Sequence, residues 1–287
     1  MSAATGRPYP VEMVCRWFGV ARSTYYAWLK GGRRGGRKRG PKTPVNDEEL
    51  VVQIREVIRS SPFHGEGYRK IRARLGLRVS GKRVLRLMRE NGLLAPVRRV
   101  HAHGPRAHDG KIQSERPNRL WGTDATRFYT EEDGWCWFFG AIDHHVEDIV
   151  GWHVAKVGDR FAAAEPVRMG VRREFGTSGR DVARGLLLRH DHGPQYTSRN
   201  FRQEMAFYGI QLSPAFVGEP EGNGIIERFM RTLKEQCLYV HRFRDLEHAR
   251  EVIGRFIELY NSAWILQRHG YRTPAQVRSD FLRKEVA

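Results

Sequence analysis

Three acidic residues are spaced so that a single fold could bring their carboxylates together. Asp124 interrupts the apolar run "LWGTDATRFYT", Asp191 follows directly on "LLLRH", and Glu227 lies in the helical segment "GNGIIERFMRTLKEQ". A buried charge is costly unless it is paired or binds a metal ion. Ligands of α/β sheets collect at the carboxyl ends of strands. Neighbouring strands would therefore join Asp124 to Asp191, and a helix packed over that end would add Glu227.

Three clustered carboxylates predict a site for divalent cations. Like charges that approach one another need a cation between them, and ligation by oxygen alone suits Mg²⁺ or Mn²⁺. Two such ions about 4 Å apart can activate an attacking oxygen and stabilise the leaving oxygen of a displacement at phosphorus. Asp124, Asp191 and Glu227 are therefore the predicted catalytic and metal-binding residues, with two ions per site.

Each of these acids also has a simpler interpretation. Asp191 precedes "HGP" and could be a turn residue, Asp124 could be an ion-pair partner, and Glu227 could be a solvated helix residue. Asp143 and Asp148 are rival acids near strand ends.

Zinc is an alternative metal, because histidines flank Asp191. The candidates are His190 and His192, or the group His101, His103 and His108. No second Cys or His pair at ligand spacing supports zinc, and the three cysteines lie far apart. If the segment is extended, at most one of His190 and His192 faces the predicted site.

The helix that carries Glu227 has one polar face. At about 100° per residue, Asn223, Met230, Arg231 and Lys234 share the face of Glu227, while apolar residues occupy the opposite side. Arg231 and Lys234 are predicted to meet DNA phosphates. Asn223 and Gln195 are candidates for DNA contact near the metals, with plain structural hydrogen bonding as the alternative.

The elements that must position these residues are a mixed sheet with flanking helices, which is an α/β arrangement. Three successive runs rich in aromatic and β-branched residues predict strands joined by tight turns, and two shorter strands alternate with helices further on. The expected strands cover residues 120–130, 134–145, 148–157, 185–191 and 210–215.

Small helical modules precede this core. Residues 11–30 predict two short helices broken at Gly19, with Ser23 as the N-cap of the second, in a helix-turn-helix-like pattern or a plain helical hairpin. Residues 46–94 predict three helices with a basic outward face, capped at Ser80 for the third. The proposed boundaries are 1–30 for the first helical segment, 31–45 for a basic linker, 46–95 for a helical DNA-binding module, 96–116 for a second basic linker, 117–240 for the catalytic core and 241–287 for a helical extension.

Basic residues in these modules are predicted to contact DNA backbone. The candidates are Arg37, Lys38 and Arg39 in the glycine-rich linker, and Arg83 and Arg86 on the third helix. A solvated cationic surface without DNA contacts is the alternative in both places.

The overall charge favours a polyanionic partner. The chain has 287 residues and a net charge of +18, from 50 Lys and Arg against 32 Asp and Glu. No basic amphipathic anchor stands out, so nucleic acid is favoured over an anionic membrane. No apolar run approaches the ~18–20 residues that span a bilayer, and no secretory signal pattern begins the chain. A cytoplasmic location is expected.

These motifs together resemble the catalytic core of retroviral-integrase-type transposases, and most of all the second-frame (OrfB-type) protein of the insertion sequence 3 family. The resemblance rests on "WGTDAT", "HDHGPQYTS" and "GNGIIERFMRTLKEQ", with 35 residues between Asp191 and Glu227 and with Lys234 seven residues after the glutamate. It extends to the helical segments upstream and to "YRTPAQ" downstream, so nearly the whole chain is covered.

This resemblance implies a ribonuclease H-like fold with Asp124, Asp191 and Glu227 as metal ligands. It implies cleavage at the ends of an insertion element to free a 3′-OH, followed by strand transfer of that hydroxyl into target DNA. The chain departs from the family pattern at His190, where a serine is usual, and has "QRHGYRTP" in place of an "RPH" segment before "TP". Neither departure removes a predicted ligand.

The family also implies partners. Terminal inverted repeats and target DNA are the expected substrates, and a homo-oligomer is expected in the DNA complex. A first-frame protein often supplies end recognition and a leucine zipper, so this chain is expected to act with such a protein or as a fusion to it. Two other functions remain open: a nuclease of the same fold that never joins ends, and a catalytically idle DNA-binding regulator.

Overall fold

The computed structural model describes residues 6–29, 45–96, 114–214 and 223–286. The chain forms two compact units, Met1–Asn46 and Asp47–Ala287. The predicted linker contacts Arg37, Lys38 and Arg39 lie outside the described residues.

The first unit contains two short helices, α1 (Val11–Trp17) and α2 (Arg22–Leu29). Gly19 lies between them with a φ of 60°, a conformation that favours glycine. The predicted helix break is therefore in place. The expectation that Ser23 caps the second helix is wrong, because α2 already begins at Arg22 and its first backbone bonds run to the carbonyl of Ala21.

The second unit begins with three helices, α3 (Asp47–Ser60), α4 (Tyr68–Leu75) and α5 (Gly81–Glu90). The Ser80 side chain accepts a hydrogen bond from the backbone N–H of Arg83, which is the predicted cap of α5. The inward residues are apolar and buried, as their helical spacing predicts: Leu50, Ile54, Ile71, Val84, Leu87 and Met88.

The core of the second unit is a five-stranded sheet in the order β3-β2-β1-β4-β5. The strands are β1 (Leu120–Thr130), β2 (Gly134–Asp143), β3 (Ile149–Ala155), β4 (Leu187–His190) and β5 (Gln211–Pro214). β1, β2 and β3 form an antiparallel meander, and β4 and β5 are parallel to β1. This is the mixed sheet that the alternation of the sequence predicts, with β1 at its centre.

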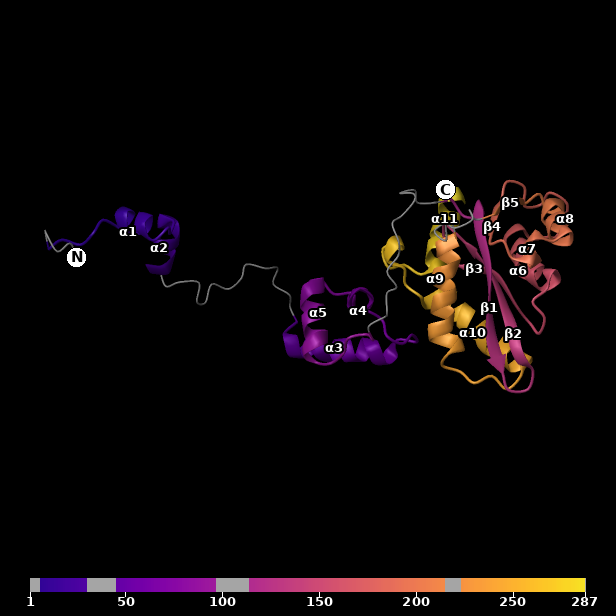
Figure 1. Ribbon diagram of the computed structural model, residues 1–287, viewed down its shortest axis with the longest axis horizontal. Coiled ribbons are helices and arrows are strands. Elements are labelled where there is room, and N and C mark those ends of the chain that lie inside the picture. The colour runs from indigo at the N-terminus through magenta and orange to yellow at the C-terminus, as the bar shows by residue number, and fades with distance from the viewer. Residues whose placement is uncertain (1–5, 30–44, 97–113, 215–222, 287) are drawn as a thin grey trace. The chain divides into compact units, whose positions relative to one another are not determined.

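Helices cover both faces of the sheet (Figure 1). α6, α7 and α8 pack on one face, and α9 and α10 pack on the other. A π-helix extends α9, and a short 3-10 helix leads to α11. Their bounds are α6 Arg160–Phe175, α7 Pro194–Thr197, α8 Arg199–Phe207, α9 Gly224–Leu233, π-helix Lys234–Leu238, α10 Leu246–Ala263, 3-10 helix Gln267–His269 and α11 Pro274–Val286.

The contact between β3 and α6 is unusually close. A Cβ built on Gly151 would lie 1.9 Å from the carbonyl oxygen of Pro166, so the helix backbone lies directly on the strand. Gly170, one turn further on, faces the indole of Trp121 from β1. Glycines on both elements therefore set the depth of this layer.

Within the described residues, no helix combines the length and the apolar character needed to cross a bilayer.

Candidate active site

Asp124 lies on β1, opposite Gly140 of β2, with its side chain toward α9. Its carboxylate accepts a hydrogen bond from the backbone N–H of Ala125 at 2.8 Å. Burial raises the pKa of Asp124 to about 6, and the negative charges of Asp191 and Glu227 add to the rise. Asp124 therefore carries a carboxylate that is shielded from water and close to two others.

Asp191 follows β4 directly and is exposed. Its Oδ1 accepts a hydrogen bond from the backbone N–H of Gly193 at 2.8 Å, which forms a tight turn. β4 runs parallel to β1, with Leu188 opposite Trp121 and Arg189 opposite Gly122. This pairing brings the end of β4 to the part of β1 that carries Asp124. Asp191 is thus a turn residue by geometry, and its charge still acts on Asp124.

His190 is a packing residue in this structure. It is 3% exposed, and its ring lies against Tyr196 and Phe201 at centroid distances of 5.7 and 6.4 Å. Its Nδ1 lies 2.6 Å from the carbonyl oxygen of Asp191. His190 therefore turns away from the acids and supports the backbone of Asp191 from beneath.

Glu227 occupies the first turn of α9 and projects toward Asp124 from above the sheet. Partial burial raises the pKa of Glu227, and the guanidinium of Arg231 lowers it. Asp124 and Glu227 line one cavity of about 330 Å³ together with Met230, Arg231, Lys234, Glu235 and Tyr239. The prediction that a helix would add an acid above the strand end is met by this placement.

The charges of Asp191 and Glu227 act on Asp124, but the three carboxylates do not meet at one point. In this conformation, no three Asp, Glu, His or Cys side chains of the described residues lie close enough to hold one metal ion. The donor chemistry still suits a hard divalent cation, because a cation would stabilise the ionised form of Asp124, whose pKa is raised chiefly by burial and further by the charges of Asp191 and Glu227.

Lys234 and Arg231 lie where the helical pattern predicts, on the lining of the acidic cavity. Met230 lines the same cavity, as its predicted place on the face of Glu227 requires, and it is also 4% exposed and packed in the core. Gln195 is half-buried on α7 and folds over Gly193.

Asn223 does not reach solvent in this structure. It is 5% exposed, and its Nδ2 donates a hydrogen bond of 3.1 Å to the carbonyl oxygen of Thr123. This hydrogen bond fastens the start of α9 to β1 beside Asp124.

The two candidate cations on α5 are engaged within the helical module. Arg83 and Arg86 each pair with Asp47 at the start of α3, at 2.6 Å. Arg86 also pairs with Glu90 at 2.9 Å. Asp47 neutralises part of the basic face, which the sequence pattern did not indicate.

The rival acids Asp143 and Asp148 belong to a buried ion-pair cluster. Both are at most 1% exposed, and Arg278 of α11 lies 2.7 Å from Asp148 and 3.7 Å from Asp143. Arg173 and Glu174 of α6 complete the cluster. These acids hold α11 to the sheet, so they do not compete for the predicted role.

One residue beneath the acids escaped the sequence analysis. Tyr196 is completely buried, its phenol lies near Thr123, and burial followed by the charges of Asp124 and Asp191 raises its pKa. The sequence signal for it is the single aromatic residue of "HGPQYTS", and in the structure this ring packs against Phe201.

Comparison with known families gives three matches along the chain. A model described as HTH-like domain matches residues 45–101, and two models described as integrase core domain match residues 114–220 and 208–274. The five-stranded mixed sheet together with these core matches gives the ribonuclease H-like fold that was expected.

Curated relatives align with almost the whole chain. Transposase InsD for insertion element IS2A/D/F/H/I/K from Escherichia coli is 26% identical over 289 residues, which are 96% of this chain and 92% of the relative. The chain is similar to this transposase over nearly its whole length. Transposase InsD for insertion element IS2-9 from Escherichia coli K12 is also 26% identical, over 96% of this chain and 91% of the relative.

Solved integrase structures are also similar to this chain. The simian T-cell lymphotropic virus intasome, solved in complex with PP2A regulatory subunit B56 gamma, aligns with a TM-score of 0.45 and 14% identity over 74% of this chain and 70% of that chain. The catalytic core domain of BIV integrase aligns with a TM-score of 0.43 and 17% identity over 59% of this chain and 99% of that chain.

Proposed function

We propose that this chain is a DNA transposase of the DDE type, which cleaves DNA at the ends of an insertion element and transfers the resulting 3′-OH to target DNA. One observation carries the proposal: Asp124 and Glu227 line one cavity, the charge of Asp191 acts on Asp124, and the flanking cations Arg231 and Lys234 open onto the same space. The homology to transposases supports the choice of this reaction over other phosphoryl transfers.

Asp124, Asp191 and Glu227 would hold Mg²⁺ or Mn²⁺, and we propose two ions per site. When bound, such ions supply charge neutralisation and activation for in-line displacement at phosphorus. Among the described residues, Asp124 accepts one hydrogen bond from Ala125 and Asp191 one from Gly193, so both carboxylates keep acceptor capacity for a cation. Asn223 and His190 hold the backbone of β1 and of the Asp191 turn, so they orient the acids without touching substrate.

Lys234 and Arg231 would bind the phosphates on either side of the reacting one. Both side chains reach the cavity from the acid-bearing face of the helix, and the structure records no ion pair for either among its described residues. Their positive charge offsets the repulsion between DNA and three carboxylates. Arg83, Arg86, Gln195 and the linker residues Arg37, Lys38 and Arg39 remain proposed DNA contacts, with Arg83 and Arg86 already bound to Asp47.

The reaction proposed for two element ends and one target DNA implies protein partners. Joining two element ends to one target requires more than one active site, so we propose a homo-oligomer in the DNA complex. An upstream first-frame protein, acting separately or as a fusion, is proposed to contribute end recognition. The domain boundaries at residues 45, 95, 116 and 240 are part of the same proposal.

Strand cleavage and strand transfer of end-containing DNA with Mg²⁺ test this function. Glu227→Gln and Asp191→Asn are expected to lower both activities at least about a hundredfold, since each removes a carboxylate that acts in the reaction itself. Glu251→Gln is the matched control, because Glu251 is exposed on α10 and carries the same charge. Full activity in a folded Glu227→Gln variant would defeat the assignment, and cleavage without any joining would identify a nuclease instead.

A further inference from the structure

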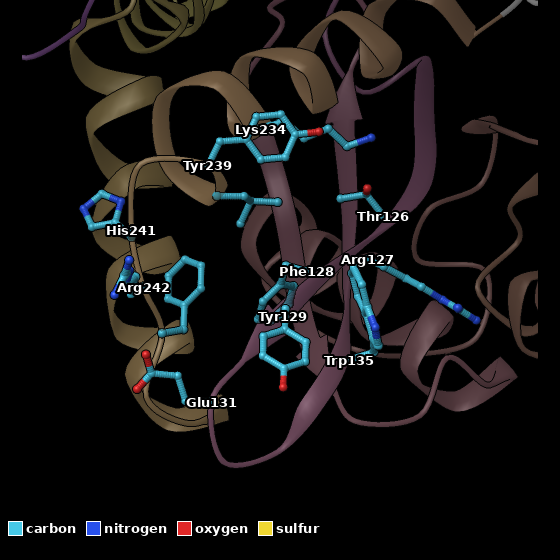
Figure 2. Close-up of a pocket in the computed structure, with 12 residues that line it drawn as sticks. Thr126, Arg127, Phe128, Tyr129, Glu131, Trp135, Lys234, Tyr239, His241 and Arg242 are labelled. Atoms are coloured by element: carbon cyan, nitrogen blue, oxygen red, sulfur yellow. The ribbon is translucent and has the colours of Figure 1, made fainter.

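A second cavity lies beside the acidic one and has a different lining. It has a volume of about 540 Å³, within the range of roughly 300–1,000 Å³ that small-ligand pockets occupy. One wall is the later half of β1 with the start of β2, and the other is the segment that follows the π-helix (Figure 2). We call this cavity the aromatic groove. Its described lining consists of Thr126, Arg127, Phe128, Tyr129, Glu131, Trp135, Lys234, Leu238, Tyr239, His241, Arg242 and Phe243.

The groove exists because β4 is shorter than β1. β4 pairs with β1 only at residues 120–122, and the next contact along that edge is the bridge between Thr130 and Phe243. Between these points, no described strand pairs with β1 on this side. This edge of β1 therefore forms part of the wall of the groove.

Three aromatic side chains of the groove are turned toward solvent. Tyr129 is 55% exposed, Trp135 is 63% exposed and Tyr239 is 74% exposed. Tyr129 and Trp135 form an edge-to-face pair with centroids 5.7 Å apart. Large aromatic rings that gather at one exposed site and contribute nothing to the core mark a binding surface.

The charges of the groove favour an anionic ligand. The structure records no ion pair for Lys234 or Arg242 among the described residues, and Glu131 is the one described acid in the lining. Arg127 points out of the groove and stacks on Trp137 at 4.5 Å. Two available cations and three exposed rings therefore belong to the lining of the same groove.

The groove is continuous with the candidate active site. Lys234 and Tyr239 line both the aromatic groove and the cavity of Asp124 and Glu227. A polyanionic strand that places a phosphate at the acids can therefore continue past Lys234 and Tyr239 into the groove.

We propose that the aromatic groove binds unpaired nucleotides of the DNA strand that passes through the active site. Bases stack on Trp135, Tyr129 and Tyr239, and the phosphates between them meet Lys234 and Arg242. Base-on-ring stacking combined with cations is how proteins hold single strands without reading their sequence. The inference rests on the proposed function for the identity of the strand, and it adds that the strand is unpaired where it leaves the acids.

A peptide strand added to the edge of β1 is the competing occupant. The exposed rings and the two free cations favour nucleotides, because a β-strand needs mainly backbone partners and side-chain pockets. Binding to tailed and blunt DNA probes distinguishes nucleotides from a peptide strand.

The test measures binding of the full chain to two DNA probes in EDTA, where no cleavage occurs. One probe is a duplex with a short unpaired tail that carries 2-aminopurine, and the other is the blunt duplex of the same sequence. Trp135→Ala is expected to weaken binding of the tailed probe about tenfold and of the blunt probe less than about twofold, and to relieve the quenching of 2-aminopurine. Trp135→Phe keeps a ring and is expected to restore most of the affinity.

Two further variants test the phosphate contact and the specificity of the ring effect. Arg242→Ala removes a phosphate contact and is expected to lower the salt dependence of tailed-probe binding by about one ion. Phe161→Ala is the matched control, since Phe161 is 49% exposed on α6 beside Arg160 and does not line the groove. Its affinity for both probes is expected to equal that of the parent chain.

Equal affinity of the parent chain for both probes would overturn the inference and point to an occupant other than DNA. Equal losses on both probes in Trp135→Ala would overturn it as well. Because binding is measured without metal, a chain that holds the tail but never cleaves would contradict the proposed function and leave the groove assignment standing.

Discussion

Asp124 lies on the middle strand of the sheet, where a negative charge is expensive without a cation. Burial raises its pKa to about 6, against 3.8 for an unperturbed carboxyl. A raised pKa in the folded state means that Asp124 costs stability above about pH 6 and costs none below about pH 4. The ionised carboxylate of Asp124 therefore lowers the free energy of unfolding at neutral pH.

Asp124→Asn is expected to stabilise the metal-free protein at pH 7.5 by on the order of 1–3 kcal/mol, because the amide carries no charge to desolvate. Urea denaturation in EDTA checks this. The gain should shrink as the pH falls through 6 and disappear near pH 4. Added Mg²⁺ should stabilise the parent chain more than the variant, and a destabilised Asp124→Asn protein at pH 7.5 would contradict the argument.

Acid changes the stability of the fold in opposite senses through His144 and through Asp124. His144 is 1% exposed, and neither of its ring nitrogens has a hydrogen-bond partner among the residues that the structure describes. Burial, followed by the charges of Arg189 and Arg268, lowers its pKa to about 4. A lowered pKa means that stability is intact above the unfolded value of 6.5 and is lost as the pH falls toward 4.

His144→Gln is expected to flatten the loss of stability between pH 6.5 and 4, because glutamine cannot take up a proton there. Denaturation midpoints across this pH range measure the slope. His64→Gln is the control, since His64 is exposed and lies on the helical module. An unchanged slope in His144→Gln would assign the acid sensitivity to other buried histidines, such as His190.

At the scale of elements, the contact of β3 with α6 sets the thickness of the layer behind the site. Gly151→Ala would place a methyl group against the carbonyl of Pro166, which neither backbone can avoid. We expect a loss of about 3 kcal/mol or more, because overpacking against a backbone cannot be relieved by a rotamer change. Thermal denaturation measures it, and Gly179→Ala, where nothing lies within 4 Å, is the matched control. Similar stability of the two variants would refute this account of the layer.

Local patterns predict the elements well but not their distant partners. β1 runs over the predicted residues 120–130, because alternating aromatic and β-branched residues specify a strand by themselves. The hydrogen bond from Asn223 to Thr123 and the pairing of Arg83 with Asp47 span 100 and 36 residues. Such pairings depend on how elements pack in space, and one helix or strand read alone contains no trace of them.

The candidate site divides in the same way. Spacing and flanking residues indicate Asp124, Asp191 and Glu227, and the structure brings Asp124 and Glu227 to one cavity. The burial of His190 and the aromatic groove could not be predicted, since both arise from the length of β4 and from the packing beneath it.

At the scale of the whole second unit, Trp264 joins the helical module to the core. Its ring lies 4.8 Å from that of Phe63, and the Lys70 ammonium lies 3.0 Å from its centroid. Gln236, two residues after Lys234, exchanges two hydrogen bonds of 2.9 Å with the backbone of His64. The π-helix beside the acids is thus bonded directly to the module that matches the HTH-like model.

Trp264→Ala is expected to loosen α3, α4 and α5 while the sheet remains folded, because it removes the ring that both Phe63 and Lys70 contact. Hydrogen exchange measured by mass spectrometry should show faster exchange in the three helices and little change in β1 and β2. Phe207→Ala, on the exposed side of α8, should leave the helices protected. Uniform acceleration throughout residues 47–286 would show that Trp264 stabilises the unit as a whole instead.

Between Gly122 and Thr130, one edge of β1 has no strand partner among the described residues, and this has a consequence for solubility. A strand edge without a partner can pair with the same edge of another molecule, and exposed Tyr129 and Trp135 would strengthen such self-association. The like charges of Lys234 and Arg242 oppose it, but their reach falls from about 10 Å at 0.1 M salt to about 3 Å at 1 M. High salt weakens the binding of DNA and also screens the repulsion between copies of the protein. The DNA-free chain is therefore expected to be least soluble at high salt.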